Sequence, residues 1–121
     1  GCFNLGNSYY DGKGVNQDYG QANTYYEKAC SLNDESGCFN LGNSYYDGKG
    51  VNQDYSQANT YYEKACSLND GNGCFNLGNS YYNGEGVKQN KNTAKEYYGK
   101  ACDYSLRQGC DSYSELNAQG Y

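Results

Sequence analysis

Residues 37–72 read GCFNLGNSYYDGKGVNQDYSQANTYYEKACSLNDGN, and this stretch decides the fold because the chain repeats it. Residues 1–36 differ from it at only three positions, Gly20, Glu35 and Ser36. Residues 73–108 form a third, more diverged copy, and residues 109–121 form a partial copy that we expect to act as a C-terminal capping helix. A period of 36 residues is typical of stacked supersecondary units, each burying its apolar face against its neighbours.

Each copy predicts a pair of helices. In the central copy, Cys, Leu, Gly and Tyr recur at helical spacing over residues 38–46, which predicts a first helix from about residue 36 to residue 46. A Gly-Lys-Gly loop ends this helix, since glycines supply the left-handed backbone of a helix end. Asp54, with Gln57 three residues on, is typical of the start of a second helix, which we expect to reach about residue 67.

The expected architecture is therefore all-α: a right-handed superhelical solenoid of antiparallel αα hairpins. No strand alternation is visible in the sequence. We expect a turn over residues 69–72 to lead into the next copy. Glu63 and Lys64 are expected on a solvated face of the second helix.

Composition narrows the classes of function. The net charge is −5, with no stripe of Lys and Arg, which argues against nucleic acid or an anionic membrane as partner. No apolar run approaches the length of a membrane span. The chain has no His, which removes Ser-His-Asp and Cys-His catalysis and His-metal sites, and the cysteine spacing does not suit zinc, so we expect no cofactor and no metal. With 17 Tyr and little aliphatic content, the core is expected to be thin and aromatic.

Seven cysteines follow the repeat, and the residues leave two pairings open. One pairs the end of each second helix with the start of the next first helix across a short turn, where the Cα atoms can come within disulfide range. The other pairs the two cysteines inside each copy, which closes longer loops. The two pairings are Cys30–Cys38, Cys66–Cys74 and Cys102–Cys110, with Cys2 left over, or Cys2–Cys30, Cys38–Cys66 and Cys74–Cys102, with Cys110 left over.

The repeat resembles the Sel-1-like repeat, a tetratricopeptide-like helical hairpin. The residues that carry the resemblance are Leu41-Gly42, Tyr45, Gly48-Lys49-Gly50-Val51, Asp54, Ala58, Tyr61-Tyr62 and Lys64-Ala65. The cysteines look like those of the cysteine-rich, secreted subgroup known from Helicobacter. The match covers nearly the whole chain; the third copy departs from it at Asn90, in the place of the capping Asp, and at Glu85, in the place of Lys49.

The resemblance implies the short pairing, with Cys2 unpaired because its partner would lie upstream. We accordingly interpret the chain, which opens within the pattern at Gly1-Cys2, as a piece of a longer array. Regular disulfides imply an oxidising compartment, so we expect a secreted or periplasmic protein. We expect a monomer, with a Cys2-linked dimer as an alternative, and a purely structural or self-associating repeat as a further reading.

Helical-hairpin solenoids line their concave face with the first helix of each hairpin, and this predicts the binding residues. Asparagines and aromatic residues recur there as ladders, and an Asn amide suits the alternating N–H and C=O groups of an extended peptide. Tetratricopeptide repeats, by the resemblance, use asparagines in this way. The hypothesis is a non-catalytic scaffold that binds extended segments of a protein or peptide partner in this groove. The predicted binding residues are Asn4, Asn7, Phe39, Asn40, Asn43, Tyr46, Asn76 and Asn79, with Phe3, Tyr10, Phe75 and Tyr82 as their equivalents.

The resemblance also implies an alternative function. Members of the cysteine-rich subgroup are described as penicillin-binding proteins with weak β-lactamase activity. The sequence has no Ser-x-x-Lys motif, and we assign no catalytic residue to that activity.

Overall fold

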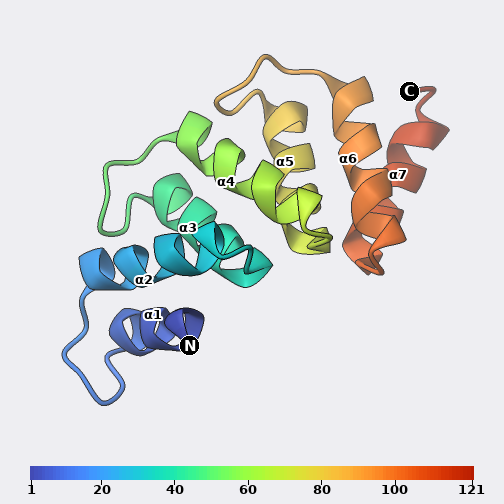
Figure 1. Cartoon of the computed structure of the whole chain (residues 1–121). Helices are drawn as coiled ribbons and strands as arrows, with labels where there is room; N and C mark the ends of the chain where they lie inside the picture. The colour runs from blue at the N-terminus through green and yellow to red at the C-terminus, as the bar shows by residue number, and fades with distance from the viewer.

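The computed structural model describes all 121 residues and contains seven α-helices and no strand. Successive helices pack against one another along an open arc, with the two chain ends far apart (Figure 1). The expected all-α solenoid of helical hairpins is confirmed. The helices are α1 (Cys2–Asp11), α2 (Tyr19–Ser31), α3 (Glu35–Asp47), α4 (Tyr55–Ser67), α5 (Gly71–Asn83), α6 (Lys91–Asp103) and α7 (Arg107–Ala118).

The hairpin loops are closed by the caps that the sequence predicts. The Asp54 side chain accepts a hydrogen bond of 3.1 Å from the Gln57 N–H at the start of α4. Gly48 ends α3 with φ 71°, a left-handed conformation that favours glycine. The Asp54 N–H also donates to the Tyr45 carbonyl at 2.9 Å, which ties the end of the loop back to α3.

The turn between repeats is shorter than expected. Gly71 and Asn72 lie in the first turn of α5, and Glu35 already belongs to α3. The reason is the preceding aspartate, because the Asp70 side chain accepts from the Asn72 N–H at 3.0 Å and so starts the helix early. Asn69 takes the left-handed conformation, φ 68°, that completes the turn.

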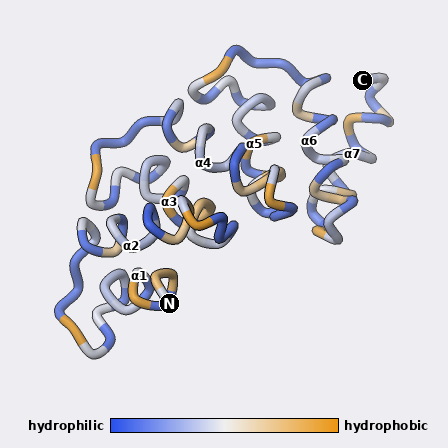
Figure 2. The backbone as a smooth tube through the Cα atoms, in the orientation of Figure 1, coloured by the Kyte–Doolittle hydropathy of each residue, from blue (hydrophilic) through white to orange (hydrophobic).

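The core is a chain of small clusters, one after another along the arc. Ala58, Tyr62 and Leu77 form one of them, each 2% exposed or less. Figure 2 shows that apolar positions are spread over all the helices and do not gather at one centre. The close packing depends on Gly42, where a Cβ atom would lie 2.7 Å from Cε1 of Tyr62. No helix combines the length and the apolar character that a bilayer crossing requires.

The hairpin loops of the second and third copies dock on the second helix of the preceding repeat. Asn23 Nδ2 donates to the Lys49 carbonyl at 2.8 Å, and Asn59 Nδ2 donates to the Glu85 carbonyl at the same distance. Gly50 has no room for a side chain, because a Cβ atom there would lie 2.7 Å from the Tyr19 carbonyl carbon. In the third copy, the position of Asn23 and Asn59 is occupied by Lys95. Its ammonium bonds to Asn117 near the end of α7 and to the Tyr121 carbonyl instead.

Three disulfides join successive repeats: Cys30–Cys38, Cys66–Cys74 and Cys102–Cys110, with Cα–Cα distances of 4.5, 4.6 and 4.5 Å. This is the pairing across the short turn, and Cys2 has no disulfide partner in the chain. Each bridge connects the last turn of a second helix to the first turn of the next first helix.

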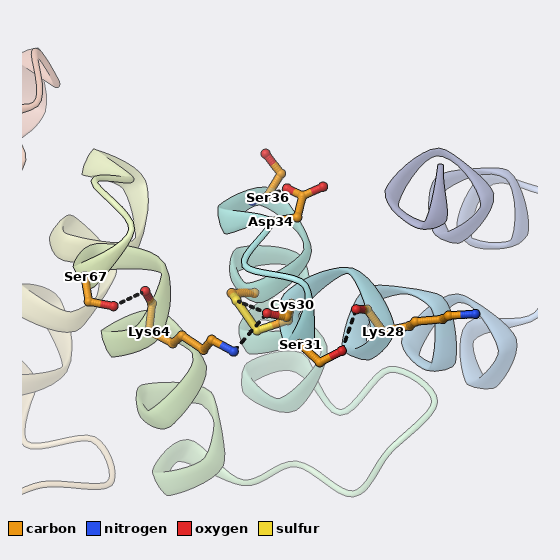
Figure 3. The surroundings of a disulfide bond; sticks show 8 residues. Lys28, Cys30, Ser31, Asp34, Ser36, Lys64 and Ser67 are labelled. Atoms are coloured by element: carbon orange, nitrogen blue, oxygen red, sulfur yellow. Dashed lines mark hydrogen bonds between the residues drawn. A yellow bond between two sulfur atoms is a disulfide. The ribbon is translucent and has the colours of Figure 1, made fainter.

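Lys64 is not on a merely solvated face, which corrects the expectation for this residue. Figure 3 shows its side chain reaching across to the end of α2 beside the Cys30 disulfide. Lys64 Nζ donates to the Cys30 carbonyl at 2.9 Å. The ammonium on α4 therefore caps the C-terminus of α2, the second helix of the preceding repeat, where the helix dipole favours positive charge.

Candidate functional site

Three hollows lie in a row along the odd-numbered helices, and each is lined from two successive odd-numbered helices and the even-numbered helix between them. Hollow 1, about 270 Å³, is lined by Asn7, Tyr10, Asp11, Tyr26, Asn40, Asn43, Ser44 and Lys49. Hollow 2, about 280 Å³, is lined by Asn43, Tyr46, Asp47, Tyr62, Asn76 and Asn79. Hollow 3, about 300 Å³, is lined by Asn79, Tyr82, Asn83, Tyr98, Ser112, Glu115 and Leu116.

One asparagine in each copy is fixed by a buried tyrosine of the following helix. The Tyr62 hydroxyl donates to Asn43 Oδ1 at 2.6 Å, and Tyr26 with Asn7 and Tyr98 with Asn79 repeat this bond at the same distance. The bond occupies the amide oxygen of Asn43 and leaves its Nδ2 without a hydrogen-bond partner in the chain. Each hollow thus has an amide whose orientation is set and whose N–H donors are free.

A second asparagine in each of the two later copies links neighbouring repeats. Asn76 Nδ2 lies 3.5 Å from Asn43 Oδ1, and Asn40 Nδ2 lies 3.4 Å from Asn7 Oδ1. Burial raises the pKa of Tyr62, and the neighbouring Asn76 amide offsets part of that rise. One asparagine contact thus joins the first and second copies, and one joins the second and third.

Most of the predicted binding residues come together in these hollows. Those that line them are Asn7, Asn40, Asn43, Tyr46, Asn76 and Asn79. Asn4 is exposed and lines none of them. Phe39 also lies outside them: its ring packs at 5.8 Å from the ring of Tyr62 and belongs to the core.

Several lining residues were missed by the sequence reasoning. Tyr26, Tyr62 and Tyr98 were counted among the tyrosines that fill the core, yet each also lines a hollow. Ser44 also lines hollow 1 and is only 3% exposed. A signal for the tyrosines was present, because the second Tyr of the Tyr-Tyr pair in each second helix recurs with the asparagine that it holds.

The charged residues of the hollows vary between copies while the frame stays constant. Lys49 lines hollow 1 and donates to the Tyr10 hydroxyl at 3.1 Å. Its equivalent beside hollow 2 is Glu85, which accepts from the Tyr46 hydroxyl at 3.0 and 2.9 Å. Burial and the bond to Glu85 raise the pKa of Tyr46 to about 12, so the phenol stays protonated and donates at neutral pH.

Fold and hollows together define a helical-hairpin repeat scaffold with a repeated polar groove. The sequence matches the Sel1 repeat over residues 1–34, 36–70 and 71–103, and the chain belongs to this family. Among curated proteins, none matches the chain.

Solved structures share the fold. The protective antigen c5321 of uropathogenic Escherichia coli, which displays an SLR fold, is 30% identical over 98% of this chain, with a TM-score of 0.92. A Sel1 repeat protein of Oxalobacter formigenes is 27% identical over 98% of this chain, with a TM-score of 0.93. The cysteine rich protein B (hcpB) of Helicobacter pylori is 35% identical over 91% of this chain, with a TM-score of 0.78.

The chain spans different shares of these proteins: 26% of the Escherichia coli antigen, 49% of the Oxalobacter protein and 85% of the Helicobacter protein. The disulfides and the likeness to the Helicobacter protein are consistent with a location outside the cytoplasm.

Proposed function

We propose that the chain is a non-catalytic scaffold, secreted or periplasmic, that binds extended segments of a partner protein along hollows 1 to 3. The observation that carries this proposal is the fixed asparagine of each copy. Asn7, Asn43 and Asn79 each give their oxygen to a buried tyrosine and keep their amide N–H groups free. A row of oriented donors matches the backbone carbonyls of an extended peptide.

Preorganisation supports the proposal on energetic grounds. An exposed Asn side chain loses rotamer freedom when it binds, which reduces the net gain from its hydrogen bonds. Here the tyrosine has already fixed the amide, and the tyrosine itself is buried with only 2% exposure at Tyr62. Most of the rotamer entropy of this Asn side chain is therefore already lost on folding, before a ligand binds.

The experiment selects ligands and then removes one donor. Random linear nine-residue peptides displayed on phage are selected on the immobilised chain, and their dissociation constants are measured for the wild type and for Asn43→Asp. This substitution keeps an oxygen for the Tyr62 hydroxyl but replaces the N–H donors with an acceptor. We expect binding to weaken by roughly fivefold, since a neutral hydrogen bond contributes about 0.5–1.5 kcal/mol.

Asn4→Asp is the matched control, because it adds the same charge on the same helix face but outside the hollows. Measuring at about 0.5 M salt screens the added charge in both variants. Circular dichroism checks that helicity is unchanged. If the selected peptides bind Asn43→Asp as tightly as the wild type, the proposal that peptides bind in these hollows is wrong.

The resemblance implies a weak β-lactamase as the alternative. The side chains of the hollows do not provide a nucleophile hydrogen-bonded to a base for that activity. Hollow 1 does hold a serine, a tyrosine and a lysine. Tyr10 and Lys49 bond to each other at 3.1 Å, however, and Ser44 is only 3% exposed with no side-chain hydrogen bond to either. Peptide binding is the function that these contacts support.

A further inference from the structure

We propose that hollow 2 receives a basic side chain, Lys or Arg, from the bound segment, and that hollow 1 does not. The inference rests on the proposed peptide binding and adds its side-chain specificity. It comes from comparing the same repeat position, Lys49 and Glu85, at two hollows that share one frame of tyrosine and asparagine.

Hollow 1 carries a cation of the chain itself on the tyrosine equivalent to Tyr46. Lys49 lines this hollow, and its Nζ lies 5.5 Å from the centre of the Tyr10 ring and bonds to the Tyr10 hydroxyl. The third copy also has a lysine beside this tyrosine, since Lys91 Nζ lies 5.2 Å from the centre of the Tyr82 ring, but Lys91 takes the place of Tyr55 and does not line hollow 3. An ammonium within about 6 Å of a tyrosine ring is attracted by the electron-rich face. The chain thus shows directly that this tyrosine position accepts a cation.

Hollow 2 has the same tyrosine without a cation. The residue equivalent to Lys49 is Glu85, and both of its carboxylate oxygens accept from the Tyr46 hydroxyl. Asp47 lines the hollow, Glu85 lies beside it through its bond to Tyr46, and no Lys or Arg is among the lining residues. Lys49 is close enough to Asp47 to interact with its charge, but the Lys49 ammonium is hydrogen-bonded to the Tyr10 hydroxyl in hollow 1.

The volume and the lining of hollow 2 suit a basic side chain. Its volume of about 280 Å³ exceeds that of an ammonium or guanidinium group. The rings of Tyr46 and Tyr62 supply aromatic lining, and Asp47 with Glu85 supplies negative charge. Asn43 and Asn79 on its two sides remain free to hold backbone carbonyls of the same segment. Main-chain binding and side-chain selection would then use different residues.

The test uses two defined peptides, acetyl-Gly-Ser-Ala-Arg-Ala-Ser-Gly-amide and the same peptide with Gln in place of Arg. Binding is followed by NMR titration of the side-chain amide signals of Asn76, which lines hollow 2, and Asn40, which lines hollow 1. We expect the Arg peptide to bind about fivefold more tightly than the Gln peptide, with the extra shift at Asn76, from the usual strength of exposed cation–π and ion-pair contacts.

Two charge swaps serve as matched variants, because each places at one copy the residue that the other copy already carries. Glu85→Lys should let the new lysine bond to Tyr46 as Lys49 bonds to Tyr10, and so abolish the preference for Arg. Lys49→Glu should give hollow 1 the pattern of hollow 2, so that the Arg peptide now shifts Asn40 as well.

The outcomes separate the two proposals. If both peptides shift Asn76 with equal affinity and Glu85→Lys changes nothing, the groove binds peptides and the basic-side-chain inference is wrong. If neither peptide shifts Asn76 or Asn40, groove binding itself fails and the inference fails with it. Loss of the Arg preference in Glu85→Lys, with the Gln peptide still bound, supports both.

Discussion

Replacing Lys64 by Met should destabilise the chain, although a lysine on a helix surface usually contributes little to stability. Met keeps most of the unbranched stem and removes the ammonium. The ammonium donates to the Cys30 carbonyl at 2.9 Å, at the end of α2, where the last carbonyls have no partner one turn further along the helix.

The structure sets the size of the effect. A hydrogen bond to a charged group contributes about 1.5–3 kcal/mol to stability. Two features place this one below that range. Lys64 is only half-buried, and the Cys30 carbonyl keeps a second donor, the Asn33 N–H at 2.9 Å, after the lysine is removed. We therefore expect a loss of about 1 kcal/mol, or about 4 °C in melting temperature for a domain of this size.

The assay is thermal unfolding followed by circular dichroism with the disulfides intact. Lys28→Met is the internal control, since Lys28 occupies the same place in the first copy, has no helix end to cap and is exposed. Its melting temperature should stay within about 1 °C of the wild type, as is usual for an exposed surface change. Equal melting temperatures for the two variants would show that the Lys64 bond contributes nothing and would refute the capping argument.

Two further predictions concern the bridges and the tyrosines. The Cys66→Ala/Cys74→Ala variant should lose about 2.5 kcal/mol of unfolding free energy, the chain-entropy value for a short closed loop, while Cys2→Ala should lose almost none; equal urea midpoints would contradict this. Unfolding free energy should also fall as pH rises from 10 to 12, because the folded chain holds Tyr46 and Tyr98 at pKa values of about 12, above the ordinary 10.0, so the unfolded chain releases those protons first. Guanidinium unfolding at pH 8, 10 and 11 measures this, and a shallower decline is expected for Tyr46→Phe; flat stability to pH 11 would count against the burial of these phenols.

The fold was predictable because three copies of the repeat carry the same helix and turn signals. Spacing along one copy gives both helices, and the caps at Gly48 and Asp54 are local signals that depend on neighbouring residues only. The early start of α5 was less visible, since Gly71 and Asn72 are typical of turns and it is the Asp70 cap that overrides them.

The candidate site was only partly predictable, because its partners come from different repeats. Asn43 could be placed on a helix face from its own copy, but the hydrogen bond that fixes it comes from Tyr62, 19 residues later. The reach of Lys64 to Cys30 spans 34 residues, and periodicity within one helix carries no information about it. Phe39 was misplaced for the same reason: its helical position suits the groove, while its contact with Tyr62 takes it into the core.

The position of the disulfides bears on how such a chain can lengthen. Each bridge crosses a junction between two copies. The two helices that a disulfide joins are therefore the second helix of one copy and the first helix of the next, not the two helices of one copy. A 36-residue copy begins with one cysteine and ends with another, as residues 37–72 do with Cys38 and Cys66. When a gene segment of that length is duplicated in tandem, the new junction therefore receives both halves of a new bridge, and every cysteine that is already bridged keeps a neighbour to pair with. Growth by duplication leaves the pattern of crosslinks intact at every intermediate length.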